Sequence, residues 1–392
     1  MRRTFLKKVS CLLLLNNHYF FASNEFAFDL YKNLKNEQGA SEKNIFFSPY
    51  SITTAMEVAY EGARGTTAQE LAQALYFDTN TKKRREKSKK RIDILNKSEN
   101  DSTLLTANAL WVEQSFKLLP NYRKIAHGWY NADINQVDFK HAPQKAEELI
   151  NSWVKEQTQG MIKAILAPHS LNELTRLVIT NAIYFKGTWV EPFDPKETKN
   201  DNFFISETVT KKVVMMHATK EYNYAQTDFG QILELEYAGD DLSMLIILPE
   251  DNNLHALEDQ LTAEHFEEWK LELMRQKVQV HIPRIKLDTS YGLVETFKKM
   301  GIHKAFDATK LGADFSGIDG KRDLYIALIN HKAALEVNEE GTTAAAATAV
   351  VMMMKSMMPR PVPEFRADHP FVIIIQEKKT GTILFMGRIV NP

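Results

Sequence analysis

A run near the C-terminus, EEGTTAAAATAVVMMMKS (residues 339–356), constrains the fold more than any other segment. Its four consecutive alanines, Ala344 to Ala347, lie between threonines and are followed by valines and methionines. Intrinsic propensity favours a helix here, because Ala and Met rank high. A packed surface helix, however, has an apolar stripe and a polar face, and this run has neither. The run therefore needs an environment in which small side chains fit on all of its sides.

The first half of the chain indicates mainly helices. In the NEFAFDLYKNL segment the apolar residues fall on one face of a helix. Ser48 followed by proline suits the start of a second helix, with proline in the first turn. Gly62 and Gly65 interrupt that helix, and a further one is expected to end near Leu75.

The second half is richer in strands. Strands are expected in the apolar, β-prone segments 177–190, 241–251 and 277–288, with a break in the first after Lys186. The C-terminal segment 369–392 contains two apolar stretches separated by a turn at Gly381, the spacing of a hairpin. Helices early and strands late favour an α+β architecture. No stretch resembling a linker divides the chain, so we expect one domain.

Composition excludes several classes of function. The chain of 392 residues is 44% hydrophobic and 25% charged, as in a soluble globular protein with a large core. A formal net charge of -1 gives no reason to expect a nucleic-acid or membrane partner. Cys11 is the one cysteine, which excludes disulfides within the chain and cysteine-based zinc sites. No HExxH, GxSxG or P-loop motif is present, so we expect no metal, no cofactor and no standard enzyme.

Residues 1–22 have two interpretations. A basic start and an apolar core from Val9 to Leu15 are typical of a secretory signal. Asn16 interrupts that core, and the alternative is a lead-in to the first helix, with the protein in the cytoplasm. Asn96 and Asn100 match the glycosylation pattern, which matters only in a secreted eukaryotic protein.

A basic run follows the early helices. It contains Lys82, Lys83, Arg84, Arg85, Lys87, Lys89, Lys90 and Arg91. One interpretation is a solvated helix or loop. The other is a site for a heparin-like polyanion, since clustered cations attract such polymers. On a helix the run would be basic on all faces, without a focused groove.

Four segments of this sequence together resemble the serpins, the metastable family of serine protease inhibitors. They are NIFFSPYSI, LVITNAIYFKGTWVEPF, HKAALEVNEEGTTAAAATAV and FRADHPFVIIIQEKKTGTILFMGRIVNP, in serpin order and spacing. The resemblance extends from about Asn24 to Pro392. It implies a serpin fold over 23–392, a single domain with about nine helices and three β-sheets. It also implies an exposed reactive-centre loop at about 339–363.

In this resemblance the small-residue run is the hinge of the loop, which inserts into a sheet after cleavage. The hinge residues are Glu339, Glu340, Gly341, Thr342, Thr343, Ala344, Ala345, Ala346, Ala347 and Thr348. Alternate residues of a strand face the same side, and the even positions from Thr342 carry no charge. Insertion would therefore bury no unpaired charge. A non-inhibitory carrier, chaperone or storage relative is the alternative, but such relatives often carry bulky or charged hinges.

The resemblance also implies the cleaved bond. The seventeenth residue counted from Glu339 is Lys355, so the reactive bond is Lys355–Ser356. Lysine suits a trypsin-like serine protease, trapped by a monomeric inhibitor in a covalent 1:1 complex. Arg360 is a weaker candidate because proline follows it. Secondary sites for elastase-like or chymotrypsin-like enzymes are Met354, Met357 and Met358.

Two further groups of residues match conformational-control sites of the family. Ser48, Ser51, Asn181 and His331 match the shutter, a polar cluster beneath the sheet that holds it closed or lets it part. Trp189, Arg284 and Glu339 match the breach, where the loop first inserts. None of them is expected to be catalytic.

Overall fold

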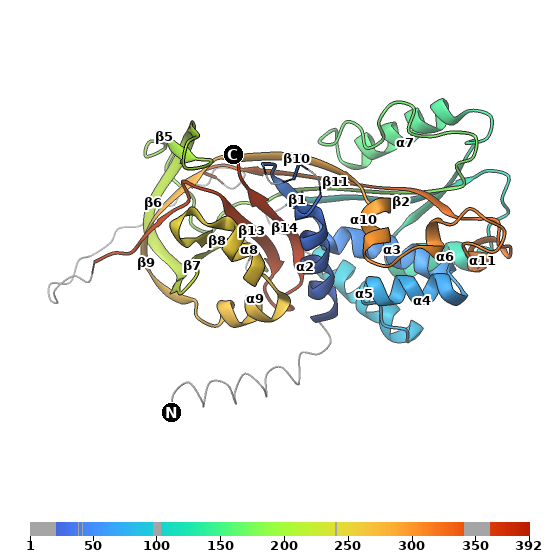
Figure 1. Ribbon diagram of the computed structural model, residues 1–392, viewed down its shortest axis with the longest axis horizontal. Coiled ribbons are helices and arrows are strands. Elements are labelled where there is room, and N and C mark those ends of the chain that lie inside the picture. The colour runs from blue at the N-terminus through green and yellow to red at the C-terminus, as the bar shows by residue number, and fades with distance from the viewer. Residues whose placement is uncertain (1–20, 38, 41, 97–102, 240, 341–360) are drawn as a thin grey trace.

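The computed structural model describes residues 21–37, 39–40, 42–96, 103–239, 241–340 and 361–392 (Figure 1). Within these ranges ten α-helices and two short 3-10 helices accompany two β-sheets, an α+β arrangement. Several expected features lie outside the described residues: the hinge from Gly341 to Thr348, the bond Lys355–Ser356, Arg360, the three candidate methionines, Asn100, and residues 1–20.

One of the two sheets has five strands. Its order is β10 (Ile285–Gly292), β11 (Ile326–Val337), β4 (Leu177–Lys186), β2 (Thr103–Glu113) and β3 (Asp133–Val137). Its neighbours β11 and β4 are parallel, with partners from Ile326 and Leu177 to Leu335 and Phe185. Strand β11 leads directly to Glu339 and Glu340, the last described residues before the loop.

The other sheet has nine strands. Its path is β1 (Ile45–Phe47), β14 (Ile383–Ile389), β13 (Phe371–Glu377), β8 (Leu242–Pro249), β7 (Gly230–Glu236), β6 (Thr210–Thr227), β9 (Met274–Pro283) and β12 (Glu364–Arg366), with β5 (Lys199–Phe204) paired to β6. We expected three sheets, and the described residues form two. Strand β6 is the reason, because its 18 residues pair first with β5 and later with β7, joining two sheets into one.

One strand expectation was wrong. Segment 277–288 is not a single strand: β9 ends at Pro283 and β10 begins at Ile285, and the two belong to different sheets. Proline lacks the N–H that a ladder needs and commonly ends a strand. Arg284 therefore lies at the corner between the sheets. The break after Lys186 and the C-terminal β13–β14 hairpin, with Gly381 at φ +68, were predicted correctly.

Helices cover both faces of the five-stranded sheet (Figure 1). On one side lie α3 (Pro49–Gly62), α4 (Gly65–Ala74), α5 (Thr81–Asn96) and α6 (Pro120–Tyr130), and on the other α7 (Pro143–Gln157). The remaining helices are α2 (Phe21–Lys35), α8 (Leu254–Gln260), α9 (Ala263–Lys270), α10 (Val294–Lys299) and α11 (Ser316–Asp319), with 3-10 turns at Glu250–Asn252 and Lys304–Phe306. No helix of the described ranges is long and apolar enough to cross a membrane.

Helix α3 is central to the packing. Its start was predicted correctly: Pro49 occupies the first turn, and the Ser48 hydroxyl caps the helix by accepting from the Ser51 N–H. Nearly all its residues are buried, against α6, β14 and strands of the five-stranded sheet. This position brings the first turn of α3 beneath the β11–β4 pair.

Candidate functional site

A buried polar cluster joins β11 to β4 from beneath. His331 and Asn181 are directly opposite each other in the two strands. The Ser48 N–H donates to His331 Nε2 at 3.0 Å, so this nitrogen carries no proton. The proton is therefore on Nδ1, which donates to the side-chain oxygen of Asn181. All three residues are buried.

The cluster extends to β2 and β14. The amide of Asn181 donates to the Ser51 hydroxyl and to the side-chain oxygen of Asn108, which is opposite it in β2. The Ser48 hydroxyl donates to the Leu384 carbonyl at 2.6 Å. The four residues expected in the shutter thus lie together, while sequence reasoning missed Asn108. Its signal was a lone amide between Ala107 and Ala109, within the mainly apolar segment LLTANALWV (residues 104–112).

The cluster carries no charge near neutral pH. Burial lowers the pKa of His331 to about 3, and a hydrogen bond with Asn181 opposes this only in part. Because every member is neutral, its hydrogen bonds can be exchanged without leaving an unpaired buried ion. Separation of β11 from β4 would therefore break hydrogen bonds without exposing an unpaired ion.

An ion pair lies where the chain leaves β11. The Glu339 carboxylate accepts from Arg284 Nε at 3.0 and 2.9 Å, and from Nη2 at 2.6 Å. Thr198 adds a hydroxyl at 2.7 Å and was missed from sequence. Burial raises the pKa of Glu339, but hydrogen bonds from Arg284 and Thr198 outweigh it, so the pKa is lowered. Glu339 is buried, whereas the Arg284 side chain is 49% exposed.

Trp189 holds the same stretch of backbone. Its N–H donates to the Glu340 carbonyl at 3.2 Å, and its indole Nε1 donates to the Asn338 carbonyl at 3.0 Å. The ring stacks on Tyr237, with centroids 4.3 Å apart. The structure therefore brings together Trp189, Arg284 and Glu339, the three residues expected in the breach.

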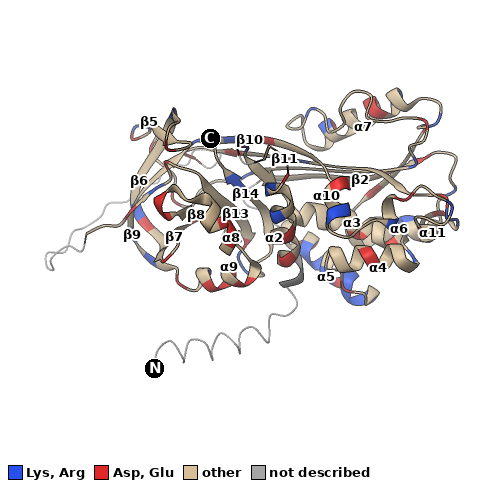
Figure 2. Ribbon diagram, in the orientation of Figure 1, with Lys and Arg blue, Asp and Glu red and all other residues tan. Residues whose placement is uncertain are grey.

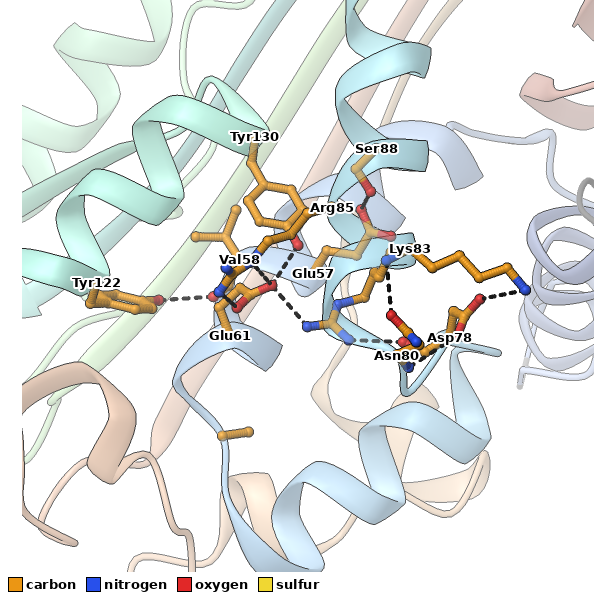
Figure 3. A network of polar contacts seen from close by, with 12 residues as sticks. Glu57, Val58, Glu61, Asp78, Asn80, Lys83, Arg85, Ser88, Tyr122 and Tyr130 are labelled. Atoms are coloured by element: carbon orange, nitrogen blue, oxygen red, sulfur yellow. Dashed lines mark hydrogen bonds and ion pairs between the residues drawn. The ribbon is translucent and has the colours of Figure 1, made fainter.

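The basic run lies on α5, where Figure 2 shows Lys and Arg gathered. Its arginines face the protein interior: Nη2 of Arg84 and of Arg85 lies 2.8 and 2.6 Å from the Glu61 carboxylate (Figure 3). Arg91 lies 2.8 Å from Glu57. Basic residues thus lie on the inner as well as the outer face of α5, and the three inner ones neutralise the buried carboxylates of Glu57 and Glu61 in α3.

The lysines of the run lie further out. Lys82 and Lys89 are 3.9 Å from Glu86 and Asp93, one helical turn ahead. Lys83 and Lys87 lie 3.5 and 3.4 Å from Asp78, and Lys90 is exposed. No group of three or more potential metal-ligating side chains occurs among the described residues.

Comparison with known proteins gives consistent matches along the chain. Residues 21–392 match the family described as serpin (serine protease inhibitor). An uncharacterized serpin-like protein of Thermococcus kodakarensis is 42% identical over 373 residues, 95% of this chain and 85% of that protein. The leukocyte elastase inhibitor of Bos taurus is 40% identical over 382 residues, 95% of this chain and 98% of that protein. Uncleaved ovalbumin superposes with a TM-score of 0.85 at 31% identity, over 95% of this chain and 99% of ovalbumin.

Proposed function

The chain belongs to the serpin family of protease inhibitors, and from that premise we propose that it is a suicide-substrate inhibitor of a trypsin-like serine protease. The topology of β11 and β4 carries this proposal. The loop follows β11, so a segment that turns back between the two strands runs antiparallel to β11. Since β4 is parallel to β11, the same segment is antiparallel to β4 as well. Insertion replaces one parallel pairing by two antiparallel ones, which are slightly more stable per residue.

The proposed reaction begins as ordinary proteolysis. The protease serine attacks the Lys355 carbonyl, its oxygen forms an ester there, and the Ser356 amine leaves with a proton. The freed loop then inserts before water hydrolyses the ester. At about 3.3 Å per residue, the strand from Gly341 to Lys355 carries the tethered protease roughly 46 Å. That displacement distorts the protease active site and consumes the inhibitor.

The two polar groups described above have distinct roles in this proposal. The contacts of Trp189 and Arg284 with residues 338–340 hold the base of the loop at the point where insertion starts. The neutral cluster around His331 holds the β11–β4 pair closed until the loop arrives. Both assignments rest on position, since the hinge lies outside the described residues.

A trypsin-like target is proposed because lysine stands at position 355. The assay is incubation of the purified protein with trypsin, followed by a denaturing gel. We expect a covalent 1:1 complex with the wild type, none with Lys355→Glu, and an unchanged complex with Arg360→Glu, a matched charge reversal in the same loop.

The other outcomes of this assay are informative. Cleavage without a complex would contradict inhibition and favour the carrier, chaperone or storage alternative. A complex that survives Lys355→Glu would show that another bond is used. Preferential trapping of elastase would place the bond at a methionine such as Met354.

Hinge insertion itself can be tested at Thr342. Thr342→Arg places a cation at the first inward position of the inserted strand, where burial without a partner costs several kcal/mol. Insertion slows while deacylation continues, so more inhibitor molecules are consumed per protease inactivated. Thr343→Arg, on the opposite face of the strand, is the matched control and should change this stoichiometry less. Equal effects of the two substitutions would contradict the assigned register.

Binding of a heparin-like polyanion stays a separate proposal. The arginines of the basic run point inward, so its outermost cations are Lys82, Lys89 and Lys90. Replacing these three by glutamine should reduce retention on heparin, and equal retention would contradict the proposal.

Secretion also stays a prediction, with the cytoplasm as the alternative, because its signal lies in residues 1–20, outside the described ranges. Expression of the full chain with fractionation of cells and medium separates the two.

A further inference from the structure

A cavity of about 340 Å³ lies among the helices of the first half of the chain. It is formed where the end of α3 meets the starts of α4, α5 and α6. The residues used below that line it are Tyr60, Arg64, Ala68, Arg84, Arg85 and Ile125. Its volume is in the range of small-molecule sites, about 300–1,000 Å³.

Positive charge dominates the wall of this cavity. Three arginines line it, against one carboxylate, that of Glu61. Burial raises the pKa of Glu61, but hydrogen bonds from Arg85, Tyr130 and Arg84 more than offset it, so Glu61 is ionised and compensates one cation. Figure 3 shows Glu61 between Arg85 and Tyr130. The lining therefore retains an excess of positive charge.

Arg84 is held in place as one cation of the wall. It is only 4% exposed, and its Nη1 and Nη2 donate to the Asp78 carbonyl and to the Glu61 carboxylate, each at 2.8 Å. The guanidinium also lies 4.4 Å from the centre of the Tyr60 ring, which fixes its plane.

The guanidinium of Arg64, also in the cavity wall, lies next to a glycine. Its Nη1 donates to the carbonyls of Glu61 and Ala63 at 2.9 and 2.7 Å, which orients the guanidinium. A Cβ at Gly317 would lie 2.5 Å from Arg64 Nη2, so a larger residue there would displace this guanidinium. The fork of an arginine fits carboxylate, sulfate and phosphate oxygens.

Two helix N-termini add to the positive potential. Helices α4 and α6 start at the cavity wall with Arg64 and Leu119 as N-cap residues, and neither side chain caps its helix. Each start carries the positive end of a helix dipole, although in α6 Pro120 has no N–H and the Tyr122 N–H is bonded to the Leu119 carbonyl. The remaining wall includes the apolar surfaces of Tyr60, Ala68 and Ile125.

We propose that this cavity binds a small organic anion, with a phosphate, sulfate or carboxylate head against the arginines and a compact apolar body against Tyr60 and Ile125. The cations line one compact, half-open cavity and do not follow a long groove, which fits a small molecule better than a polymer. The proposal does not depend on the proposed inhibitory activity.

Isothermal titration calorimetry with phenyl phosphate tests the proposal on the full chain. We expect phenyl phosphate to bind about tenfold or more tightly than inorganic phosphate, because the ring buries apolar surface. Phenol, which lacks the anion, should give no measurable binding. Absence of binding by phenyl phosphate, or equal affinity for inorganic phosphate, would overturn the proposal.

Two variants locate the binding. Arg64→Gln removes a charge from an exposed position and should weaken phenyl phosphate binding about tenfold to hundredfold. Ala68→Phe fills the cavity without changing charge and should abolish binding. Lys90→Gln, an exposed cation on α5 outside the cavity, is the matched control and should bind as the wild type does. Thermal melts verify folding, and wild-type affinity in either cavity variant would refute the assigned site.

Discussion

The cluster around His331 and the ion pair of Arg284 with Glu339 both hold β11 or the chain just beyond it, but they differ in chemistry. The cluster lies midway along β11 and β4, whereas the ion pair joins the chain just beyond β11 to the corner between β9 and β10. The midway cluster is uncharged, and its members Ser48, Ser51, Asn181 and His331 are buried. The ion pair is charged, with the arginine half exposed to water.

The difference follows from the cost of burying charge. A buried salt bridge leaves a costly unpaired ion when its partners separate. Neutral hydrogen bonds in the middle of the pair can be broken and formed again at lower cost, whereas a pair near solvent can separate into water. The stability of the closed sheet should therefore depend more on the buried neutral cluster than on the visible ion pair.

The largest expected effect is that of His331→Leu. It removes the acceptor for the Ser48 N–H and the donor for Asn181, leaving two buried groups unsatisfied. We expect the free energy of unfolding to fall by about 3 kcal/mol. Urea denaturation measures it, with Lys332→Leu as control, since that side chain pairs with the exposed Asp288 on the other face. Equal losses in both variants would contradict a special role for the cluster.

The two regions should lose their contributions to stability at different pH values. His331 is neutral in the folded protein, so the unfolded chain binds the extra proton, and its contribution is lost as pH falls from 6.5 towards about 3. The slope is about 1.4 kcal/mol per pH unit for one proton. The stability gap between wild type and His331→Leu should narrow over this window. His217 and His281, whose pKa values burial also lowers, are present in both proteins and cancel.

The ion pair should respond in a lower pH range. The folded pKa of Glu339 is below 4.5, so its contribution is lost only as pH falls below about that value. The gap between wild type and Glu339→Gln should therefore stay constant from pH 6.5 to 5. If the difference in unfolding free energy between wild type and Glu339→Gln already closed at pH 6, the acid sensitivity would belong to the ion pair, and its assignment to His331 would be contradicted.

The smallest expected effect is that of the ion pair itself at neutral pH. Arg284 is half exposed, and solvent screening limits such pairs to about 0–1 kcal/mol. A double-mutant cycle with Arg284→Met and Glu339→Gln measures this coupling. A coupling energy equal to the loss in His331→Leu would remove the distinction between the two regions.

The elements set by neighbouring residues could be predicted from sequence. The Ser48 cap, the break at Gly62 and the β13–β14 hairpin depend on residues a few positions apart. Sheet membership could not be predicted, because it depends on pairing between distant segments. A long strand such as β6 does not reveal, in its own pattern, that it has different partners at its two ends.

The residues of the candidate site could likewise be predicted only in part. Ser48, Asn181 and His331 were found through family resemblance and lie together. Asn108 and Thr198 join the two groups only through strand register and loop packing, which no local spacing encodes. Likewise, the arginines of α5 appeared to be surface charges because Glu57 and Glu61 belong to another helix.

The strands that follow the loop have a further consequence. Strand β12 pairs with β9, β13 with β8, and β14 with β1, and every residue of β13 and β14 is buried. A cut at Lys355–Ser356 would therefore divide one polypeptide into two without dividing the particle. The product would behave as an obligate heterodimer encoded by a single gene, eluting as one species under native conditions and separating into its unequal subunits only in denaturant.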